Sequence, residues 1–197
     1  MEYASIWAFE ADPAKVWEFY SRRLGVLTEA EPNPAHLALA ELERRGLVSA
    51  VVTQNIDLLH ERAGSREVIE VHGSIRTSSC RVCGLRLPLE QVLGLLPVPG
   101  CPACGTVLKP DVVMFGEPMP ERETLRAFAL AREAGLLLVV GSSLEVHPVA
   151  GLPDETLAAG GSLAIVNRGA TPYDLHAELK LDASAGDVLA GVVEALA

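Results

Sequence analysis

Residues 48–64 read VSAVVTQNIDLLHERAG, an apolar run that ends abruptly in polar side chains. Similar apolar runs recur as VIEV at 68–71, DVVMF at 111–115, LLLVV at 136–140 and LAIV at 163–166. Short, continuous apolar strands of this kind are typical of a parallel sheet that is covered on both faces. We therefore expect an α/β fold with a doubly wound parallel sheet.

The stretches between these runs carry helical signals. Asp12 and Asn33 are candidate N-caps, and each is followed by a proline at the first helical position. Gly46 stands where a helix needs a left-handed residue after its C-terminus. We expect helices over residues 12–23, 33–46, 120–135 and 185–196. Helices that alternate with apolar strands support the same fold class.

Composition and charge narrow the class of protein. A chain of 197 residues with 49% hydrophobic residues can bury a core without disulfide bonds. The formal net charge is −10, whereas a nonspecific nucleic-acid binder needs a basic face, so nucleic acid is not expected as the main partner. The longest apolar run is too short to cross a bilayer, and the first residues lack a secretory signal. We expect a cytoplasmic protein without a membrane partner, of unknown oligomeric state.

Two cysteine pairs lie in a segment, about 74–110, that breaks the alternation. Cys80 and Cys83 are separated by seventeen residues from Cys101 and Cys104, and a glycine follows each pair. Four thiolates in two matched pairs are typical ligands of one tetrahedral zinc ion. Because four thiolates leave no position for water, we expect one structural zinc in a small inserted subdomain. A redox dithiol pair is the alternative that this spacing leaves open.

Polar residues at the ends of the apolar runs are candidates for the chemistry, because ligands of such sheets bind at the carboxyl ends of strands. Gln54, Asn55 and Asp57 follow the first run, and His72 follows the second, where it is placed to act as a base. The segment 141–143 offers backbone donors and hydroxyls to a phosphate. The alternative for each is structural, since Asn and Asp often cap helices and a lone histidine is usually part of the packing.

Taken in order, these strings resemble the sirtuins, which are NAD-dependent protein lysine deacylases. The matching strings are TQNIDLLHERAG, VHGS, the four cysteines, PDVVMFGE, GSSLEVHPVAGLP and VNRGATP, and they span nearly the whole chain. The resemblance implies a Rossmann-like large domain with an inserted zinc-binding small domain. It also implies that NAD and an acylated lysine of a protein substrate enter a cleft between them, and that nicotinamide and O-acyl-ADP-ribose are formed.

The resemblance assigns roles residue by residue. It makes His72 the general base. The NAD-binding residues that it implies are Gln54, Asn55, Ile56, Asp57, Gly141, Ser142, Ser143, Asn167, Arg168, Gly169 and Ala185. The substrate-binding residues that it implies are Tyr20, Arg23, Val113, Phe115, Gly116 and Val146. Strands around 113–116 and 145–147 are expected to hold the substrate peptide between them as an added β-strand.

Tyr20 and Arg23 form a Tyr-x-x-Arg pair on one face of the first helix. The pair resembles that of the sirtuin subgroup that prefers succinyl and malonyl lysine. A guanidinium and a phenol suit the carboxylate of such an acyl group. The alternative is that Tyr20 packs in the core while Arg23 is a solvated helix end.

The chain departs from the family at its phosphate loop. The family opens with a strand and a Gly-Ala-Gly-x-Ser loop, whereas no two glycines of this sequence are spaced as Gly-x-Gly. We therefore expect residues 1–197 to be an N-terminally truncated deacylase domain. The alternative function is a catalytically impaired module that binds acylated peptides or a protein partner. A smaller departure is Lys109, where the family often has arginine.

Overall fold

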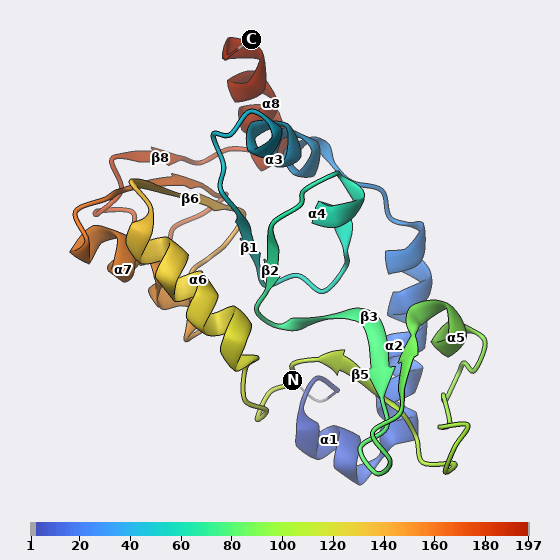
Figure 1. Ribbon diagram of the computed structural model, residues 1–197. Coiled ribbons are helices and arrows are strands. Elements are labelled where there is room, and N and C mark those ends of the chain that lie inside the picture. Colours follow the sequence, from blue (N-terminus) through green and yellow to red (C-terminus); the bar gives the residue numbers. More distant parts are fainter. Residues whose placement is uncertain (1–2, 197) are drawn as a thin grey trace. The chain divides into compact units, whose positions relative to one another are not determined.

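The computed structural model describes residues 3–196, which form two compact units (Figure 1). Unit 1 contains the described part of residues 1–31 together with 53–59 and 72–120. Unit 2 contains residues 32–52 and 60–71 and the described part of 121–197. The chain therefore passes between the units several times, and each unit is assembled from segments that are distant in sequence.

Unit 1 is built around a three-stranded antiparallel sheet of order β4-β3-β5. Its elements are α1 (Ile6–Ala11), α2 (Pro13–Glu29), β3 (Gly73–Ser79), β4 (Arg86–Pro88), α5 (Leu89–Leu93) and β5 (Lys109–Val112). The expected parallel strand over 111–115 is wrong, because β5 ends at Val112 and pairs antiparallel with β3. An apolar run alone does not determine which partner a strand finds or in which direction it runs.

Helix α2 supplies much of the core of unit 1. The Asp12 side chain accepts a hydrogen bond from the Lys15 backbone N–H, which confirms the predicted cap. Trp17, fully buried on this helix, donates its indole N–H to the Leu108 carbonyl at 2.6 Å. Cys80 and Cys101 belong to the same buried cluster, so the cysteine pairs are continuous with the core of this unit.

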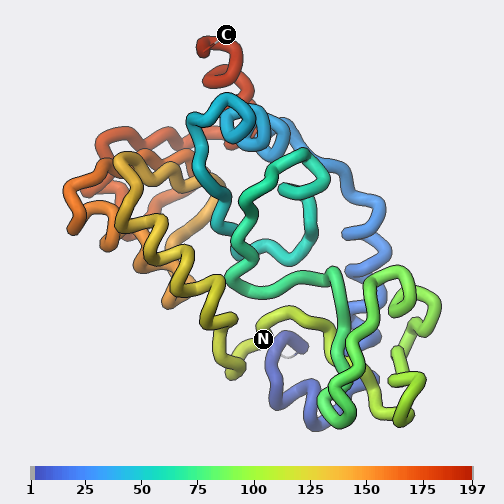
Figure 2. Tube along the Cα trace, viewed as in Figure 1, coloured from blue at the N-terminus to red at the C-terminus, as the bar shows by residue number. Residues whose placement is uncertain are grey.

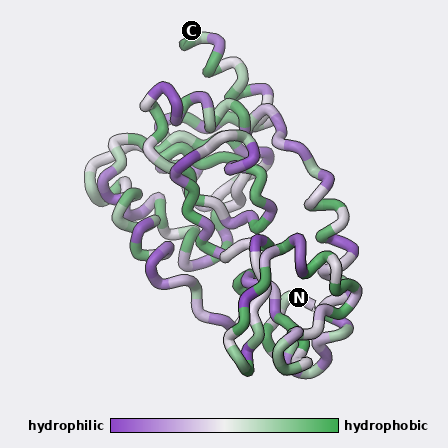
Figure 3. Tube along the Cα trace, turned by 45° about the vertical axis from the view of Figure 1, so that its right-hand side comes forward, coloured by the Kyte–Doolittle hydropathy of each residue, from purple (hydrophilic) through white to green (hydrophobic). Residues whose placement is uncertain are grey.

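Unit 2 holds the parallel part of the fold. Its strands β6 (Leu136–Val140), β7 (Ser162–Val166) and β8 (Leu179–Leu181) form a parallel sheet of order β6-β7-β8. Strands β1 (Val51–Thr53) and β2 (Val68–Glu70) pair separately, with Thr53 counted in unit 1. Strands β6, LLLVV, and β7, SLAIV, are almost wholly hydrophobic, as the apolar runs of the sequence predict. Figure 3 shows hydrophobic and hydrophilic stretches alternating along the chain.

Helical segments alternate with these strands along the chain. They are α3 (Pro34–Arg44), α4 (Leu59–Arg62), α6 (Glu121–Glu133), the 3-10 turn η1 (Val149–Gly151), α7 (Leu152–Ala158) and α8 (Ala185–Ala195). Helices α3 and α8 are distant in sequence but lie side by side (Figure 2), and Leu39 and Leu189 share one buried cluster with Val51. The buried Thr156 hydroxyl on α7 donates to the Ala131 carbonyl on α6 at 2.6 Å.

The predicted cap at Asn33 and the predicted glycine at 46 agree with the structure. Asn33 accepts hydrogen bonds from the backbone N–H groups of Ala35 and His36, and Gly46 has the expected positive φ of 75°. The first predicted helix extends further than expected, to Glu29. Within residues 3–196, no helix combines the length and apolarity that spanning a membrane requires.

We predict that Trp17→Phe destabilises unit 1. The substitution leaves the buried Leu108 carbonyl without its donor, which typically costs about 1–3 kcal/mol. Urea unfolding followed by circular dichroism measures the loss. Trp7→Phe is the matched control, because Trp7 is 65% exposed and its change is expected to cost about 0.5 kcal/mol or less. Equal losses for the two variants would contradict the role given to the indole hydrogen bond.

Candidate functional site

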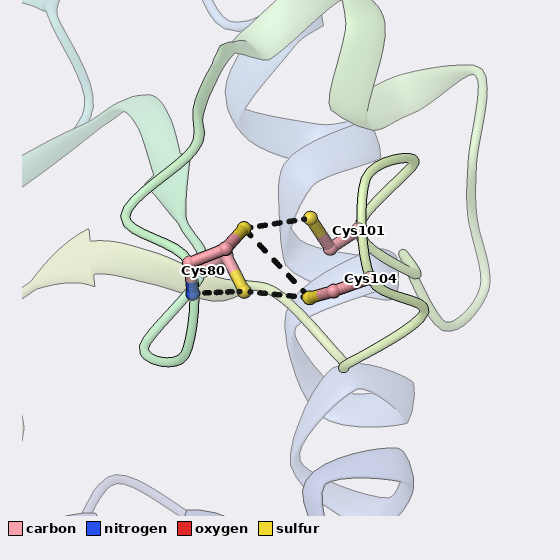
Figure 4. Close-up of side chains that lie close together, drawn as sticks. Cys80, Cys101 and Cys104 are labelled. Atoms are coloured by element: carbon pink, nitrogen blue, oxygen red, sulfur yellow. Dashed lines mark hydrogen bonds between the residues drawn. The ribbon is translucent and has the colours of Figure 1, made fainter.

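The four cysteines converge to form a candidate metal centre in unit 1 (Figure 4). Their four sulfur atoms lie within 4.8 Å of one another. The Sγ–Sγ distances are 3.4 Å from Cys80 to Cys104, and 3.5 Å and 3.7 Å from Cys83 to Cys101 and Cys104. Zinc–sulfur bonds of about 2.3 Å in a tetrahedron place the sulfurs about 3.8 Å apart. The donor set therefore fits one zinc ion.

The two cysteine pairs have the same backbone geometry. The Cys80 N–H donates to the Leu85 carbonyl at 2.7 Å, and the Cys101 N–H donates to the Thr106 carbonyl at 2.8 Å. In each loop a glycine with φ near 75°, Gly84 or Gly105, donates its N–H back to the carbonyl of the first cysteine. A side chain is strained at such φ values, which explains the glycine after each pair.

Thr106 also acts on a sulfur atom directly. Contacts with the Thr106 hydroxyl and backbone lower the pKa of the Cys104 thiol to about 6. A lowered pKa favours the thiolate, which is the form that binds metal. Cys80 and Cys101 are buried while Cys83 and Cys104 are exposed, so the cluster lies at the edge of the core.

His72 is half-buried in unit 1, immediately before β3. Its Nδ1 lies 3.2 Å from the Gln54 carbonyl oxygen. When Nδ1 carries the proton it donates to this carbonyl, and Nε2 is then the basic nitrogen. Gly73 has a φ of 67°, and a Cβ there would lie 2.2 Å from the Asp111 carbonyl oxygen. Glycine after His72 is thus required by the close approach of β5.

The segment 54–57 lies beside His72 in unit 1. The Ile75 N–H donates to the Ile56 carbonyl at 3.1 Å, which ties this segment to β3. The Asp57 carboxylate accepts a hydrogen bond from the Leu59 N–H at 3.0 Å, which is a local turn contact just before α4. The Asn55 N–H donates to the Thr53 hydroxyl, and the Asn55 side chain is exposed.

The predicted nucleotide residues of unit 2 lie at the carboxyl ends of neighbouring parallel strands. Gly141–Ser143 follow β6, and Asn167–Gly169 follow β7. The Gly141 N–H donates to the Val166 carbonyl at 2.9 Å, which joins the two loops. Ala185 is the first residue of α8. The parallel register of β6 and β7 therefore brings two loops that are distant in sequence to one edge of the sheet.

Lys180 is a residue of this edge that sequence reasoning missed. Its ammonium group donates to the carbonyls of Asn167 and Gly169, at 2.9 Å and 2.7 Å. The Asp182 carboxylate accepts from the Gly169 N–H at 3.3 Å. The alternation of apolar and polar residues in the short strand β8 was the available signal. It does not show which loop the side chains of Lys180 and Asp182 contact.

The predicted substrate residues of unit 1 follow β5. The Val113 N–H donates to the His72 carbonyl at 2.8 Å, which joins this segment directly to the candidate base. Phe115, 51% exposed, bridges Ser5 through its backbone, and Gly116 lies under the ring of Trp7. Continuous strands were expected over 113–116 and 145–147, but the structure has only the isolated bridge at Phe115 and irregular backbone at 145–147. Val146 is exposed in unit 2.

Tyr20 and Arg23 differ in burial. Tyr20 is 7% exposed, and the Arg23 guanidinium lies over the Phe19 ring at 5.1 Å from its centroid. Burial raises the pKa of the Tyr20 phenol, the charge of Arg23 lowers it, and the charge of Glu117 raises it. The burial of these two residues matches the alternative of a core tyrosine and an exposed arginine. The charges of Arg23 and Glu117 nevertheless both act on the pKa of the Tyr20 phenol, so both groups lie near it.

Backbone strain marks two of the candidate loops. Leu58 and Leu144 have positive φ values of 66° and 55°, although neither is a glycine. Leu58 directly follows Asp57, and Leu144 directly follows Ser143. Bulky residues rarely adopt this conformation, and it persists where surrounding contacts enforce it, often at ligand sites.

We predict that the cysteine cluster binds one zinc ion that stabilises unit 1. Cys101→Ser removes a buried ligand, so we expect loss of zinc and a lower melting temperature, because metal binding and folding are coupled. Elemental analysis and thermal unfolding are the measurements, and re-addition of zinc to chelated wild-type protein is the control. Folded wild-type protein that contains no zinc would contradict this prediction.

Comparison with known proteins adds an independent finding. The profile described as Sir2 family matches residues 2–148. An NAD-dependent protein deacylase of Pyrococcus furiosus is 46% identical over 198 residues, covering 98% of this chain and 79% of that protein. An NAD-dependent protein deacetylase of Caldivirga maquilingensis is 47% identical, covering 94% of this chain and 73% of that protein.

Solved structures agree with these relatives. The structure of Sir2Tm bound to a propionylated peptide has a TM-score of 0.95 and 40% identity, covering 98% of this chain and 83% of that one. A complex described as Sir2-p53 peptide-NAD+ has a TM-score of 0.93 and 40% identity, covering 97% and 81%. The resemblance seen in the sequence is therefore confirmed, and the chain belongs to the Sir2 family.

Proposed function

We propose that this protein removes acyl groups from lysine side chains of proteins in an NAD-dependent reaction. Membership of a family whose relatives are named NAD-dependent protein deacylases and deacetylases is the observation that carries the proposal. At the level of the family the chain is an enzyme. The products are nicotinamide and O-acyl-ADP-ribose, and the cysteine cluster holds a structural zinc ion. Cysteines that bind metal and form no disulfide are typical of a reducing compartment, so we propose that the reaction takes place in the cytoplasm.

The donor set of unit 2 fits the adenosine side of NAD. Backbone N–H groups and hydroxyls of Gly141–Ser143 suit a phosphate, and the amide of Asn167 suits a ribose hydroxyl. Arg168, Gly169 and Ala185 complete this side of the proposed site. In unit 1, Gln54, Asn55, Ile56 and Asp57 form the proposed nicotinamide side, adjacent to His72.

His72 is the proposed general base. When bound, NAD supplies the ribose carbon to which the acyl oxygen is joined as nicotinamide leaves. The Gln54 carbonyl holds the Nδ1 proton of His72, so Nε2 is oriented to take a proton from a ribose hydroxyl. The Val113 N–H fixes the His72 backbone, and the segment Val113–Gly116 of unit 1 is proposed to bind the acylated peptide. Val146 of unit 2 is a second proposed peptide-binding residue.

A second candidate function is a binding module for acylated peptides or for a protein partner. It follows from the expectation, stated with the sequence, that residues 1–197 do not include a Gly-x-Gly loop, which would supply backbone donors to a pyrophosphate. The two candidates differ in nicotinamide release. Binding of an acyl-lysine peptide without any nicotinamide release would favour the module.

We predict that His72→Ala lowers deacylation by at least about a hundredfold, as expected for loss of a general base. Nicotinamide release and mass spectrometry of the acylated peptide measure the effect. Circular dichroism should be unchanged, because His72 is only half-buried. The control is His176→Ala, an exposed histidine that contacts Tyr173 in unit 2. Retention of a tenth of wild-type turnover by His72→Ala would exclude it as the base.

We further propose that the enzyme prefers succinyl and malonyl lysine over acetyl lysine. Arg23 would pair with the acyl carboxylate and Tyr20 would donate its hydroxyl. Because Arg23 is exposed, solvent weakens this pairing, and we expect about a tenfold preference, which is about 1.4 kcal/mol.

We predict that Arg23→Met abolishes this preference, measured as the ratio of kcat/KM for succinyl and acetyl peptides of the same sequence. Arg22→Met is the matched control, because the adjacent Arg22 pairs with Glu18 at 2.5 Å on an exposed face of the same helix. A wild-type ratio near one, or the same ratio in both variants, would refute the acyl-carboxylate role.

A further inference from the structure

Lys109 is an unusual lysine. Of the three lysines in the sequence, all of them within the described residues, only Lys109 is buried, with 8% of its surface exposed. A buried ammonium group is costly unless hydrogen bonds and a counter-charge replace its water. The contacts of the Lys109 ammonium group therefore indicate which part of the structure it stabilises.

Each of the three donors of the Lys109 ammonium group has an acceptor. It donates to the carbonyls of Pro110 and Val112 at 3.1 Å and 2.8 Å, and its Nζ lies 2.8 Å from a carboxylate oxygen of Glu117. An ammonium group has three N–H donors and no acceptor. The set is thus complete, and the acceptors come from both ends of the segment 109–117.

Glu117 fixes the same segment from the other side. The carboxylate oxygen that faces Lys109 also accepts the Met114 N–H at 2.9 Å. The Glu117 N–H donates to the Met114 carbonyl at 2.9 Å. Between these contacts lies Val113, whose N–H donates to the His72 carbonyl. The ion pair of buried Lys109 with half-buried Glu117 therefore holds the backbone between β5 and Glu117.

We propose that Lys109 is a positioning residue for acyl-peptide binding, which acts through Glu117 and the backbone of 112–116. The inference rests on the proposed function, in which 113–116 holds the substrate peptide. Arginine is common in the family at this position, but its donors lie in one plane. The tetrahedral ammonium of Lys109 instead reaches two carbonyls and a carboxylate that surround it.

Lys109→Met is the first test, since methionine has a similar length without the charge. We expect KM for the acyl-lysine peptide to rise by about tenfold while KM for NAD changes less than about twofold. Lys109→Arg should restore part of the peptide KM. Lys15→Met is the matched control, because Lys15 is exposed on α2, and it should leave both constants unchanged. An equal rise in both constants, or no rise, would overturn the proposal.

Glu117→Gln provides a second variant that keeps an acceptor for the Met114 N–H. Lys109→Met leaves a charged carboxylate without its partner, so adding Glu117→Gln should recover part of the loss. Strictly additive effects of the two substitutions on peptide KM would contradict a functional pair. Zinc content and circular dichroism show whether each variant is folded. If Lys109→Met does not fold, the peptide KM of Glu117→Gln is measured in its place.

Hydrogen exchange separates this inference from the proposed function. In Lys109→Met the amides of Val113 and Met114 should exchange at least about tenfold faster, and in Lys15→Met they should not. Lack of deacylation by the wild-type protein would count against the proposed function, and binding of the labelled acyl peptide would then replace KM. Faster exchange with unchanged peptide affinity would overturn the positioning role. Unchanged exchange would show that Lys109 does not fix the backbone of 112–116.

Discussion

The close approach of β3 and β5 at Gly73 is the constraint on which the candidate catalytic region depends. The two strands are in register at Gly73 and Val112, and the register shifts between Gly73 and Ser78. With any side chain at Gly73, the Asp111 carbonyl would have to move, and the hydrogen bond from Val113 to His72 with it. The position of the candidate base is thus determined by backbone contacts, which depend little on the side chains around it.

The cysteine cluster lies at the other end of the same two strands. Cys80 directly follows β3, and Cys104 lies shortly before β5. Cys80 and Cys101 share a buried cluster with Trp17 and Val112. An ion bound by four thiolates has no open position for chemistry, yet it would hold both strands where they leave the cluster. A structural metal can therefore contribute to a reaction by limiting the movement of the strands that carry it.

Much of the fold was predictable where the signal is local. Asp12 and Asn33 cap their helices through side-chain hydrogen bonds between near neighbours, and the apolar runs of β6 and β7 form the expected parallel pair. Strand β3 was missed because its sequence, GSIRTSS, is mostly polar and pairs within a small sheet. The run at 111–115 was misassigned because hydrophobicity does not report that Pro110 and Val112 pair antiparallel with β3.

The candidate site was predictable to the extent that its residues belong to recognisable sequence motifs. His72, the cysteines and the segment 54–57 are recognisable because chemistry requires these residue types at fixed spacing. Lys109 and Lys180 are different, because both donate to backbone carbonyls that any residue could supply, although Lys109 also pairs with the Glu117 carboxylate. For the carbonyl contacts the identity of the acceptor residue is irrelevant, and only the path of the backbone reveals them. Residues that position a site through main-chain acceptors are therefore hard to recognise in a single sequence, even where the motifs of the site itself are recognisable.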